Sequence, residues 1–348
     1  EDGRRDEIIT TLFSHPSDAA VPKVKGYKVV ILPPDEEGLP DMEAYRSALS
    51  ERTAAIFFTN PEDTGIFNSR IAEFTELARK YGALCCYDQA NANGLLGIAR
   101  AREAGFDMSF FNLHKTFSSP HGCGGPATGL LMVDRALEPY LPVPVVRRDE
   151  RSGRYYLDFN LPKSCGKVKA FYGVIPVVLR SYAWIMSLGA EGLEEASRIA
   201  VLNNNYFMKK MREVRGCSIS FPRHPARIEQ VRYSWEQMKR ETGFGTADVQ
   251  RRIADFGTHY WSSHEPWVIP EPFTIEPSES YSKEDLDEYL GIMEQISREC
   301  YEEPETIRRA PESSTIHLID HEYLDDPDRW AITWRQYTKK YRGYFERR

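Results

Sequence analysis

Asn60, Asp88 and Lys115 each follow a short apolar run of the chain, and their side chains could do chemistry together. Short apolar runs bounded by turn residues are typical of buried strands. In an open parallel sheet, ligands bind beyond the carboxyl ends of the strands, where the loops leave a crevice. We therefore expect the amide, the carboxyl and the amine to line one cleft.

These three groups are the ones that pyridoxal 5'-phosphate (PLP) chemistry requires. The amine of Lys115 would hold the cofactor as a Schiff base until an amino-acid substrate displaces it. The carboxylate of Asp88 would keep the pyridine nitrogen protonated, so that the ring accepts electrons from the substrate Cα. Asn60 would hydrogen-bond the ring hydroxyl. The glycine-rich segment 120–126 would let backbone pass close to the ligand, whereas the glycine patterns of nucleotide-binding loops are absent.

The elements that must position these groups are predicted from hydrophobic periodicity. Five apolar runs, at residues 28–33, 54–59, 83–88, 108–112 and 129–133, predict strands. Residues 69–81 carry apolar side chains at helical spacing and end before Gly82, a helix-stop signal. Strands that alternate with helices predict an α/β fold with a mostly parallel sheet covered on both faces.

The pattern changes in the second half of the chain. Long helices are predicted at 163–188 and 191–215, shorter ones at 247–256 and 283–300, and strands at 216–221 and 267–276. These elements predict a smaller α+β C-terminal domain. We place the boundaries so that 1–185 belongs to the large domain, 186–310 to the small domain and 311–348 to a C-terminal tail.

Composition narrows the class of protein. The chain has 348 residues, a formal charge of -7 and no basic block, so nucleic acid is not expected as a partner. Its apolar runs are far shorter than the ~20 residues that span a bilayer, so no membrane is expected either. The six cysteines lack zinc spacing, which predicts no metal site and a reducing, cytoplasmic compartment. Because the sequence starts with neither Met nor an apolar signal core, residue 1 is interpreted as the edge of a fragment.

Several segments carry a resemblance to a known family, the glycine-cleavage P-protein, a PLP-dependent glycine decarboxylase, in its subunit 2 or C-terminal-half form. They spread from about residue 15 to residue 310, and the longest are TNP (59–61), YDQAN (87–91), NLHKTFSSPHG (112–122), SLGAEGL (187–193) and IEPSES (275–280). The resemblance implies a fold-type-I PLP-dependent transferase of the aspartate aminotransferase type. It also implies a catalytic set and further cofactor contacts: Lys115, His114 and Asp88, then Ala90, Asn60, His15 and Thr116.

The sequence departs from the family pattern in several places. Cys123 interrupts the family's glycine run, Gln89 replaces a glycine after Asp88, and the family's His-Gly-Thr-Asn segment is His15-Pro16-Ser17-Asp18. The loop after Gly257 is also different and contains His259. The candidates for substrate or loop contacts are therefore His121, Gly122, Cys123 and His259.

Some of these residues have a simpler interpretation. A single lysine after a strand is usually a solvated surface residue. The presence of Asn60 and Asp88 after neighbouring strands, together with the family resemblance, favours a cofactor-binding role for Lys115. His15 and His114 could contact the cofactor or merely hydrogen-bond within the crevice. Cys123 could be a redox residue, although a small side chain that fills a glycine site is the simpler interpretation.

The resemblance implies decarboxylation of an amino acid, glycine first, with transfer of the aminomethyl group to a lipoyl carrier protein. An altered substrate or Cα reaction, as in a transaminase or an aldolase-like lyase, is the alternative, and a non-catalytic scaffold subunit is a third. The phosphate-binding turn of such enzymes comes from upstream sequence, so a second chain is expected to supply this N-terminal part. A paralogous subunit or a second copy of the chain is expected in the complex.

Overall fold

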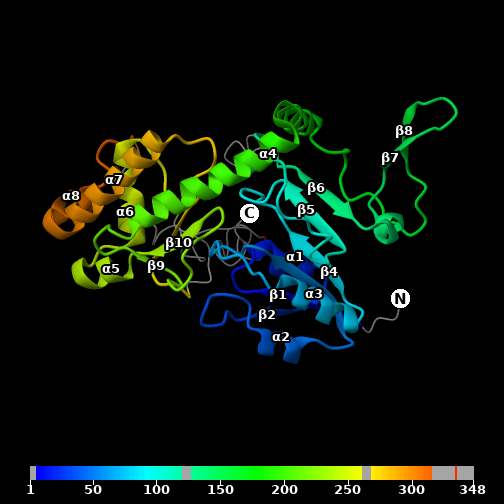
Figure 1. Cartoon of the computed structure of the whole chain (residues 1–348), viewed down its shortest axis with the longest axis horizontal. Helices are drawn as coiled ribbons and strands as arrows, with labels where there is room; N and C mark the ends of the chain where they lie inside the picture. Colours follow the sequence, from blue (N-terminus) through cyan, green and yellow to red (C-terminus); the bar gives the residue numbers. More distant parts are fainter. Residues whose placement is uncertain (1–4, 120–126, 261–267, 316–333, 335–348) are drawn as a thin grey trace, which may run out of the picture.

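A computed structural model describes residues 5–119, 127–260, 268–315 and 334. Its larger unit contains a sheet with the strand order β2-β1-β3-β4-β5-β6 (Figure 1). Neighbouring strands are parallel, except that β6 runs antiparallel to β5. The strands are β1 (Glu7–Thr11), β2 (Lys28–Leu32), β3 (Thr53–Thr59), β4 (Leu84–Asp88), β5 (Met108–Asn112) and β6 (Gly129–Val133).

The mostly parallel sheet predicted from the apolar runs is confirmed, and the predicted runs correspond to β2 through β6. Strand β1 was not predicted. It lies between β2 and β3 and is buried along its whole length, yet its sequence Glu-Ile-Ile-Thr-Thr has no continuous apolar run. Its threonines are buried by the neighbouring elements, which sequence periodicity does not reveal.

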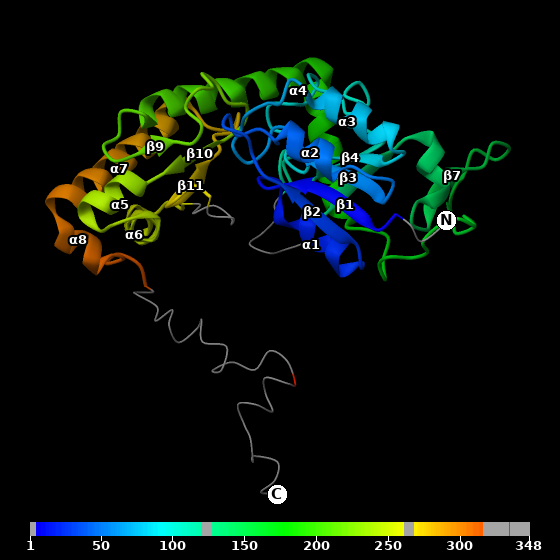
Figure 2. The same cartoon turned by 90° about the horizontal axis from the view of Figure 1, so that it is seen from below.

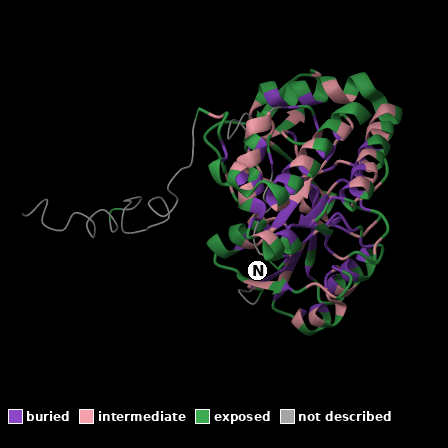
Figure 3. Ribbon diagram, turned by 90° about the vertical axis from the view of Figure 1, so that its left-hand side faces the viewer, coloured by how far each residue is buried: buried purple, intermediate pink, exposed green. Residues whose placement is uncertain are grey.

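Helices α1 (Pro16–Val24), α2 (Met42–Ala48) and α3 (Ile71–Lys80) pack against this sheet, and α3 is the helix predicted at 69–81. Phe74 of α3 packs against Tyr45 of α2 and Phe58 of β3, with ring centroids 4.9 Å and 5.5 Å apart. Figure 3 shows the buried residues gathered on the strands and in the layer beneath the helices. This core holds the carboxyl ends of β3 and β4 in place.

A long helix, α4 (Ile175–Met211), runs along both units (Figure 2). The predicted break between the helices at 163–188 and 191–215 is confirmed, because α4 has a kink there, but the outer bounds of the prediction are wrong. Gly166 and Gly173 have φ values of 92° and 112°, so the helix begins only at Ile175. Gly189, with φ 65° and ψ -172°, marks a kink inside α4. The domain boundary proposed at 185/186 lies just before this glycine.

The smaller unit is α+β. Its sheet has the order β11-β10-β9 with antiparallel pairing. The stacked rings of Trp235, Tyr260 and Phe273 form the centre of its core. Strands β9 and β11 are shorter than the predicted runs, and β10 was not predicted. The elements are β9 (Ser218–Ile219), β10 (Val231–Ser234), α5 (Glu236–Thr242), α6 (Thr246–Ile253), η2 (Ala254–Phe256), β11 (Pro272–Ile275), α7 (Lys283–Glu302) and α8 (Pro304–Arg309).

Between β6 and α4 the chain forms η1 (Arg135–Tyr140) and a protruding hairpin of β7 (Val145–Arg148) and β8 (Tyr155–Asp158) (Figure 1). No helix among the described residues is both long enough and apolar enough to cross a membrane. Most of the proposed tail 311–348 lies outside the described residues.

Candidate active site

The carboxyl ends of neighbouring strands bring together several of the predicted residues. Asp88 ends β4, Lys115 lies in the loop after β5, and His15 lies just before α1. The positive charges of Lys115 and His15 act on the Asp88 carboxyl and favour its ionised form. This edge of the sheet therefore holds an amine, an imidazole and a carboxylate within electrostatic reach of one another. That they line a cleft stays a prediction.

Asp88 is buried, with 3% of its surface exposed. Its Oδ1 accepts a hydrogen bond of 2.7 Å from the backbone N–H of Ala90. Burial raises the pKa of Asp88, whereas this hydrogen bond and the nearby Lys115 oppose the rise. Ala90, predicted as a cofactor contact, thus contributes its backbone to the orientation of the carboxylate.

Lys115 is exposed, so its amine is accessible to a ligand. The loop around it is held at two points. The Oγ1 of Thr116 accepts a hydrogen bond of 3.0 Å from the backbone N–H of Ala92, which connects the loops after β4 and β5. The Nδ1 of His114 accepts a hydrogen bond of 3.2 Å from the N–H of Thr128. In the neutral ring this leaves the proton on Nε2.

Asn60 is buried, and its amide holds a neighbouring loop. Its Oδ1 accepts a bond of 2.8 Å from the N–H of Asn68, and its Nδ2 donates a bond of 3.1 Å to the carbonyl of Asn68. The hydroxyl of Tyr87 donates to the Asn60 carbonyl. The contact of Asn60 with a ring hydroxyl stays a prediction, because these bonds give the amide a structural task.

Of the remaining candidates, the described residues place only His15 within electrostatic reach of Asp88. His121, Gly122 and Cys123 lie outside the described residues. His15 caps α1, with its Nδ1 2.7 Å from the Oγ of Ser17. His259 is exposed in the smaller unit, and its carbonyl accepts a bond of 3.0 Å from the hydroxyl of Tyr289. Its role toward a substrate stays a prediction.

Three carboxyl groups near the site were not singled out from the sequence: Asp18, Glu229 and Glu276. The charge of Lys115 acts on both glutamates, and burial raises the pKa of each. The Oε2 of Glu229 is buried with no hydrogen-bond partner in the part of the chain that the structure describes. Acidic side chains are usually solvated, so no local pattern singled out these three.

Glu276 connects the two units. Its Oε1 accepts hydrogen bonds from the Nδ2 of Asn91 at 2.6 Å and of Asn93 at 2.5 Å, which places the segment after β11 against the loop after β4. We expect Glu276→Ala to lower the free energy of unfolding by about 1.5–3 kcal/mol in urea titrations, because it removes an acceptor for two amides.

Glu276→Gln keeps an oxygen for the amides and should cost less than Glu276→Ala. Glu76→Ala, an exposed change on α3, serves as the control and should stay within about 0.5 kcal/mol of the wild type. Equal losses for Glu276→Ala and Glu76→Ala would refute the connecting role of Glu276.

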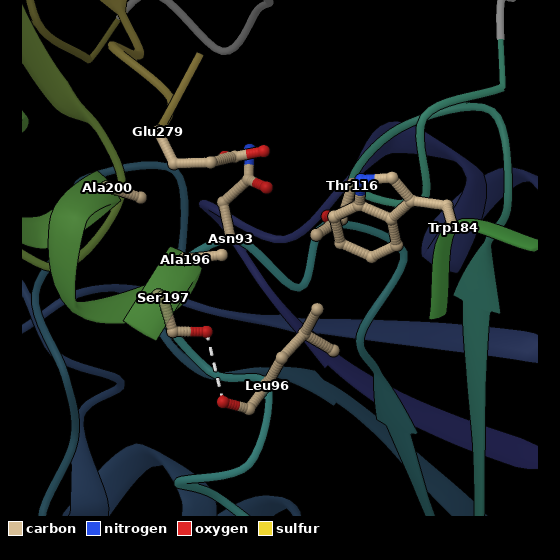
Figure 4. Close-up of a pocket in the computed structure, with 9 residues that line it drawn as sticks. Asn93, Leu96, Thr116, Trp184, Ala196, Ser197, Ala200 and Glu279 are labelled. Carbon is tan, nitrogen blue, oxygen red and sulfur yellow. Dashed lines mark hydrogen bonds between the residues drawn. The ribbon is translucent and has the colours of Figure 1, made fainter. Parts of the chain in front are cut away.

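A narrow crevice lies between α4 and the loop after β4 (Figure 4). It has no room for a water molecule, so it is a packing seam rather than a ligand site. The Oγ of Ser197 donates a bond of 3.0 Å to the carbonyl of Leu96 across it. The residues that line it are Asn93, Gly94, Leu96, Thr116, Trp184, Ala196, Ser197, Ala200 and Glu279. Thr116 lines this seam, so packing in the seam supports the loop that carries Lys115.

No His, Cys, Asp or Glu cluster among the described residues is placed to hold a metal ion.

Comparison with known proteins gives consistent matches over the whole chain. The profile of the family "Aminotransferase class-V" matches residues 3–143, and that of "Glycine dehydrogenase, C-terminal domain" matches residues 196–317. Two relatives are named "Probable glycine dehydrogenase (decarboxylating) subunit 2". The one from Pyrococcus furiosus is 43% identical over 96% of this chain and 66% of its own length. The one from Thermococcus kodakarensis is 41% identical over 98% of this chain and 67% of its own length.

Solved structures show the same fold. A glycine decarboxylase (P-protein) of the glycine cleavage system, in inhibitor-bound form, has a TM-score of 0.71 at 20% identity over 84% of this chain and 66% of that chain. The apo cysteine desulfurase of Thermococcus onnurineus NA1 has a TM-score of 0.64 at 18% identity over 85% of this chain and 73% of that chain. The predicted fold-type-I architecture is thereby confirmed. The chain spans 66% of the length of the Pyrococcus furiosus relative.

Proposed function

This chain belongs to the family of glycine dehydrogenase (decarboxylating) subunit 2, and we propose that it takes part in the PLP-dependent decarboxylation of an amino acid, glycine first. One observation supports this proposal most: Lys115 and Asp88 lie at the same carboxyl edge of the parallel sheet, where the charge of Lys115 favours the ionised form of Asp88. The exposed amine would react with the aldehyde of PLP, and the buried carboxylate would bind its protonated ring nitrogen.

The residues at this edge fit the cofactor. Lys115 would hold PLP through its amine, and Asp88 would bind the ring nitrogen as an anion. When bound, PLP supplies an electron sink for the electron pair that the substrate Cα–carboxylate bond releases. His15 lies within electrostatic reach of Asp88, and the bond from Thr128 to Nδ1 of His114 orients the imidazole beside Lys115 in the chain. The bond between Thr116 and Ala92 joins the loops that carry Lys115 and follow Asp88.

The overall reaction balances without an external oxidant. The Cα–carboxylate bond breaks and CO₂ leaves, while the aminomethyl group forms a C–S bond to one sulfur of a lipoyl disulfide. The S–S bond breaks, and the other sulfur takes up a proton and becomes a thiol, so the disulfide is the group that is reduced. We propose a lipoyl carrier protein as the acceptor for this reason and from the resemblance to the P-protein.

The test is exchange of labelled bicarbonate into the carboxyl group of glycine. The assay needs PLP, a lipoyl carrier and the complete complex with its partner subunit. We expect labelled glycine to form only when the carrier is present. Exchange into a different amino acid but not into glycine would contradict glycine as the substrate.

A different amino acid or another reaction at Cα is the second candidate. Gln89 follows Asp88 and is buried, with 3% of its surface exposed, where the resembling family carries glycine. A larger side chain at this position reshapes the site next to the ring-binding carboxylate. Product analysis with a panel of amino acids separates decarboxylation from transamination and from aldol-type cleavage.

We further propose that a partner subunit covers an apolar face of α4. Leu179, Tyr182 and Met186 recur at helical spacing on this helix and are 60%, 60% and 63% exposed. The hairpin residues Tyr155 and Tyr156 are 72% and 51% exposed. Large exposed apolar side chains on one face of a helix mark an interface. The relatives' name, subunit 2, supports a second subunit as the partner.

We expect the double change Leu179→Asp and Met186→Asp to prevent assembly, because it places two charges in an apolar interface. Size-exclusion chromatography with light scattering on the mixed subunits measures this. Tyr81→Asp, an exposed position after α3, is the control and should leave the complex intact. A complex of unchanged size with the double variant would rule out α4 as the contact.

We also propose the cytoplasm as the compartment. The thiols of Cys85 and Cys86 are buried and free, which fits a reducing environment.

A further inference from the structure

Asp18 is a buried acid that contacts the site from α1. It is 4% exposed, and its carboxyl hydrogen-bonds the carboxyl of Asp88. The Oγ of Ser14 donates a hydrogen bond to the Oδ2 of Asp18, and the same Oγ lies 3.3 Å from the Oγ1 of Thr59. Two carboxyl groups in contact within a buried site cannot both be ionised, so they share one proton.

The surroundings decide which carboxyl carries the proton. Asp88 accepts the N–H of Ala90 and lies near Lys115 and His15, all of which favour its ionised form. For Asp18, burial and the charge of Asp88 raise the pKa to about 8, although the hydrogen bond from Ser14 opposes this rise. The proton therefore resides on Asp18 at neutral pH.

We propose that Asp18 is a positioning residue that keeps a proton at neutral pH and donates it in a hydrogen bond to Asp88. The pair then carries a single negative charge. Asp88 is oriented by two donors, the Asp18 hydroxyl and the Ala90 N–H. That this charge faces the ring nitrogen of PLP rests on the proposed function, whereas the shared proton does not.

The charged and titratable groups around the pair come from several elements. Cys86 lies on β4 with Asp88, Asp63 lies in the loop after β3, Lys115 lies after β5 and His15 lies before α1. The negative charge of Asp63 disfavours ionisation of Asp18, and burial raises the pKa of the Cys86 thiol, so this thiol stays neutral. The charge of Asp63 therefore favours a proton on Asp18, whereas the charges of Lys115 and His15 favour the ionised form of Asp88.

Carbon NMR of the full chain, labelled at the aspartate carboxyl carbon and free of PLP, tests the proposal directly. We expect one aspartate carbon to titrate with a midpoint near pH 8 and this titration to vanish in Asp18→Asn. Asparagine still accepts from Ser14 through Oδ1 and donates to Asp88 through Nδ2, so the variant should fold. Ser14→Ala should move the midpoint to higher pH, because it removes a donor that favours the ionised form.

The proposal is overturned if no aspartate carbon titrates above pH 6, or if such a titration survives in Asp18→Asn. A merely structural Asp18 would be ionised at neutral pH, and its carboxyl carbon would not titrate near pH 8 in the wild type or in Ser14→Ala. PLP is absent from this experiment, so the experiment separates the two proposals. A midpoint near pH 8, combined with no cofactor attachment at Lys115 in the complete complex, would contradict the proposed function but support the shared proton.

Stability against pH gives a second readout. The pKa of Asp18 is raised in the folded chain, so its contribution to stability is complete below the ordinary carboxyl range and is lost as pH rises toward about 8. Within that window, the folding equilibrium constant of the wild type should fall relative to Asp18→Asn by up to about tenfold per pH unit. A ratio that does not change with pH would contradict the proposal.

Glu62 offers a matched control for both readouts. It is buried, and burial raises its pKa to about 8. Glu62→Gln should therefore also change the pH dependence of stability. Glu62→Gln should not change the pH midpoint of the Asp18 carboxyl carbon, because the carboxyl of Glu62 is not part of the Asp18–Asp88 pair. Loss of that midpoint in Glu62→Gln would assign the titration to something other than Asp18 and would overturn the proposal.

Discussion

Lys115→Ala is expected to abolish covalent attachment of PLP and to lower turnover by at least about 10²–10⁴-fold, the range that a positioned proton-transfer group contributes. The variant removes the amine that, in the proposed function, holds the cofactor and transfers protons at the site. Borohydride reduction of the complete complex followed by peptide mass mapping measures the attachment. In the wild type we expect a pyridoxyl group on the peptide that contains Lys115.

Lys80→Ala is the matched control, because this exposed lysine lies at the end of α3. It should retain the adduct and the activity. A small primary amine added to Lys115→Ala should restore part of the turnover if the lysine acts through its amine. An unmodified Lys115 in a PLP-saturated wild-type complex would instead favour the non-catalytic scaffold.

The fold could be predicted from the sequence where hydrophobic periodicity is strong. The runs that became β3, β4 and β5 are apolar and end in turn residues, so both the strands and the polar residues after them were identified. Strand β10 was missed because its sequence, Val-Arg-Tyr-Ser, includes an arginine that is 1% exposed. Burial of Arg232 depends on neighbours such as Asp63, 3.6 Å away, which no local pattern reveals.

The site could be predicted only in part, for a related reason. Asp88 and Lys115 follow adjacent strands of one sheet, and the register of parallel strands brings strand ends together. Asp18 and Glu276 reach the same place from α1 and from the segment after β11, so only tertiary packing reveals them. Acidic side chains in loops are ordinarily solvated, and their burial here is visible only in the folded chain.

Asp88→Asn should lower turnover by about 10²–10³-fold, the cost of removing one preorganised electrostatic group from an active site. Asparagine keeps an oxygen for the N–H of Ala90, so the loop geometry is retained while the charge is lost. The affinity for PLP should fall as well, by about 10–100-fold, because a hydrogen bond between charged groups contributes ~1.5–3 kcal/mol. Spectroscopic titration with PLP and steady-state kinetics measure the two effects separately.

Asp88→Asn also tests the electrostatic coupling between Asp88 and Asp18. The charge of Asp88 is one of the causes that raise the pKa of Asp18, after burial itself. In Asp88→Asn this charge is absent, so the aspartate-carbon midpoint of Asp18 should move below pH 8 while staying above the ordinary carboxyl range. Asp88→Glu keeps the charge and should keep a raised midpoint, even if the longer side chain slows turnover. A midpoint that is the same in the wild type and in Asp88→Asn would mean that the two carboxyls do not share a proton, and Asp88 would then hold its charge through Ala90, Lys115 and His15 alone.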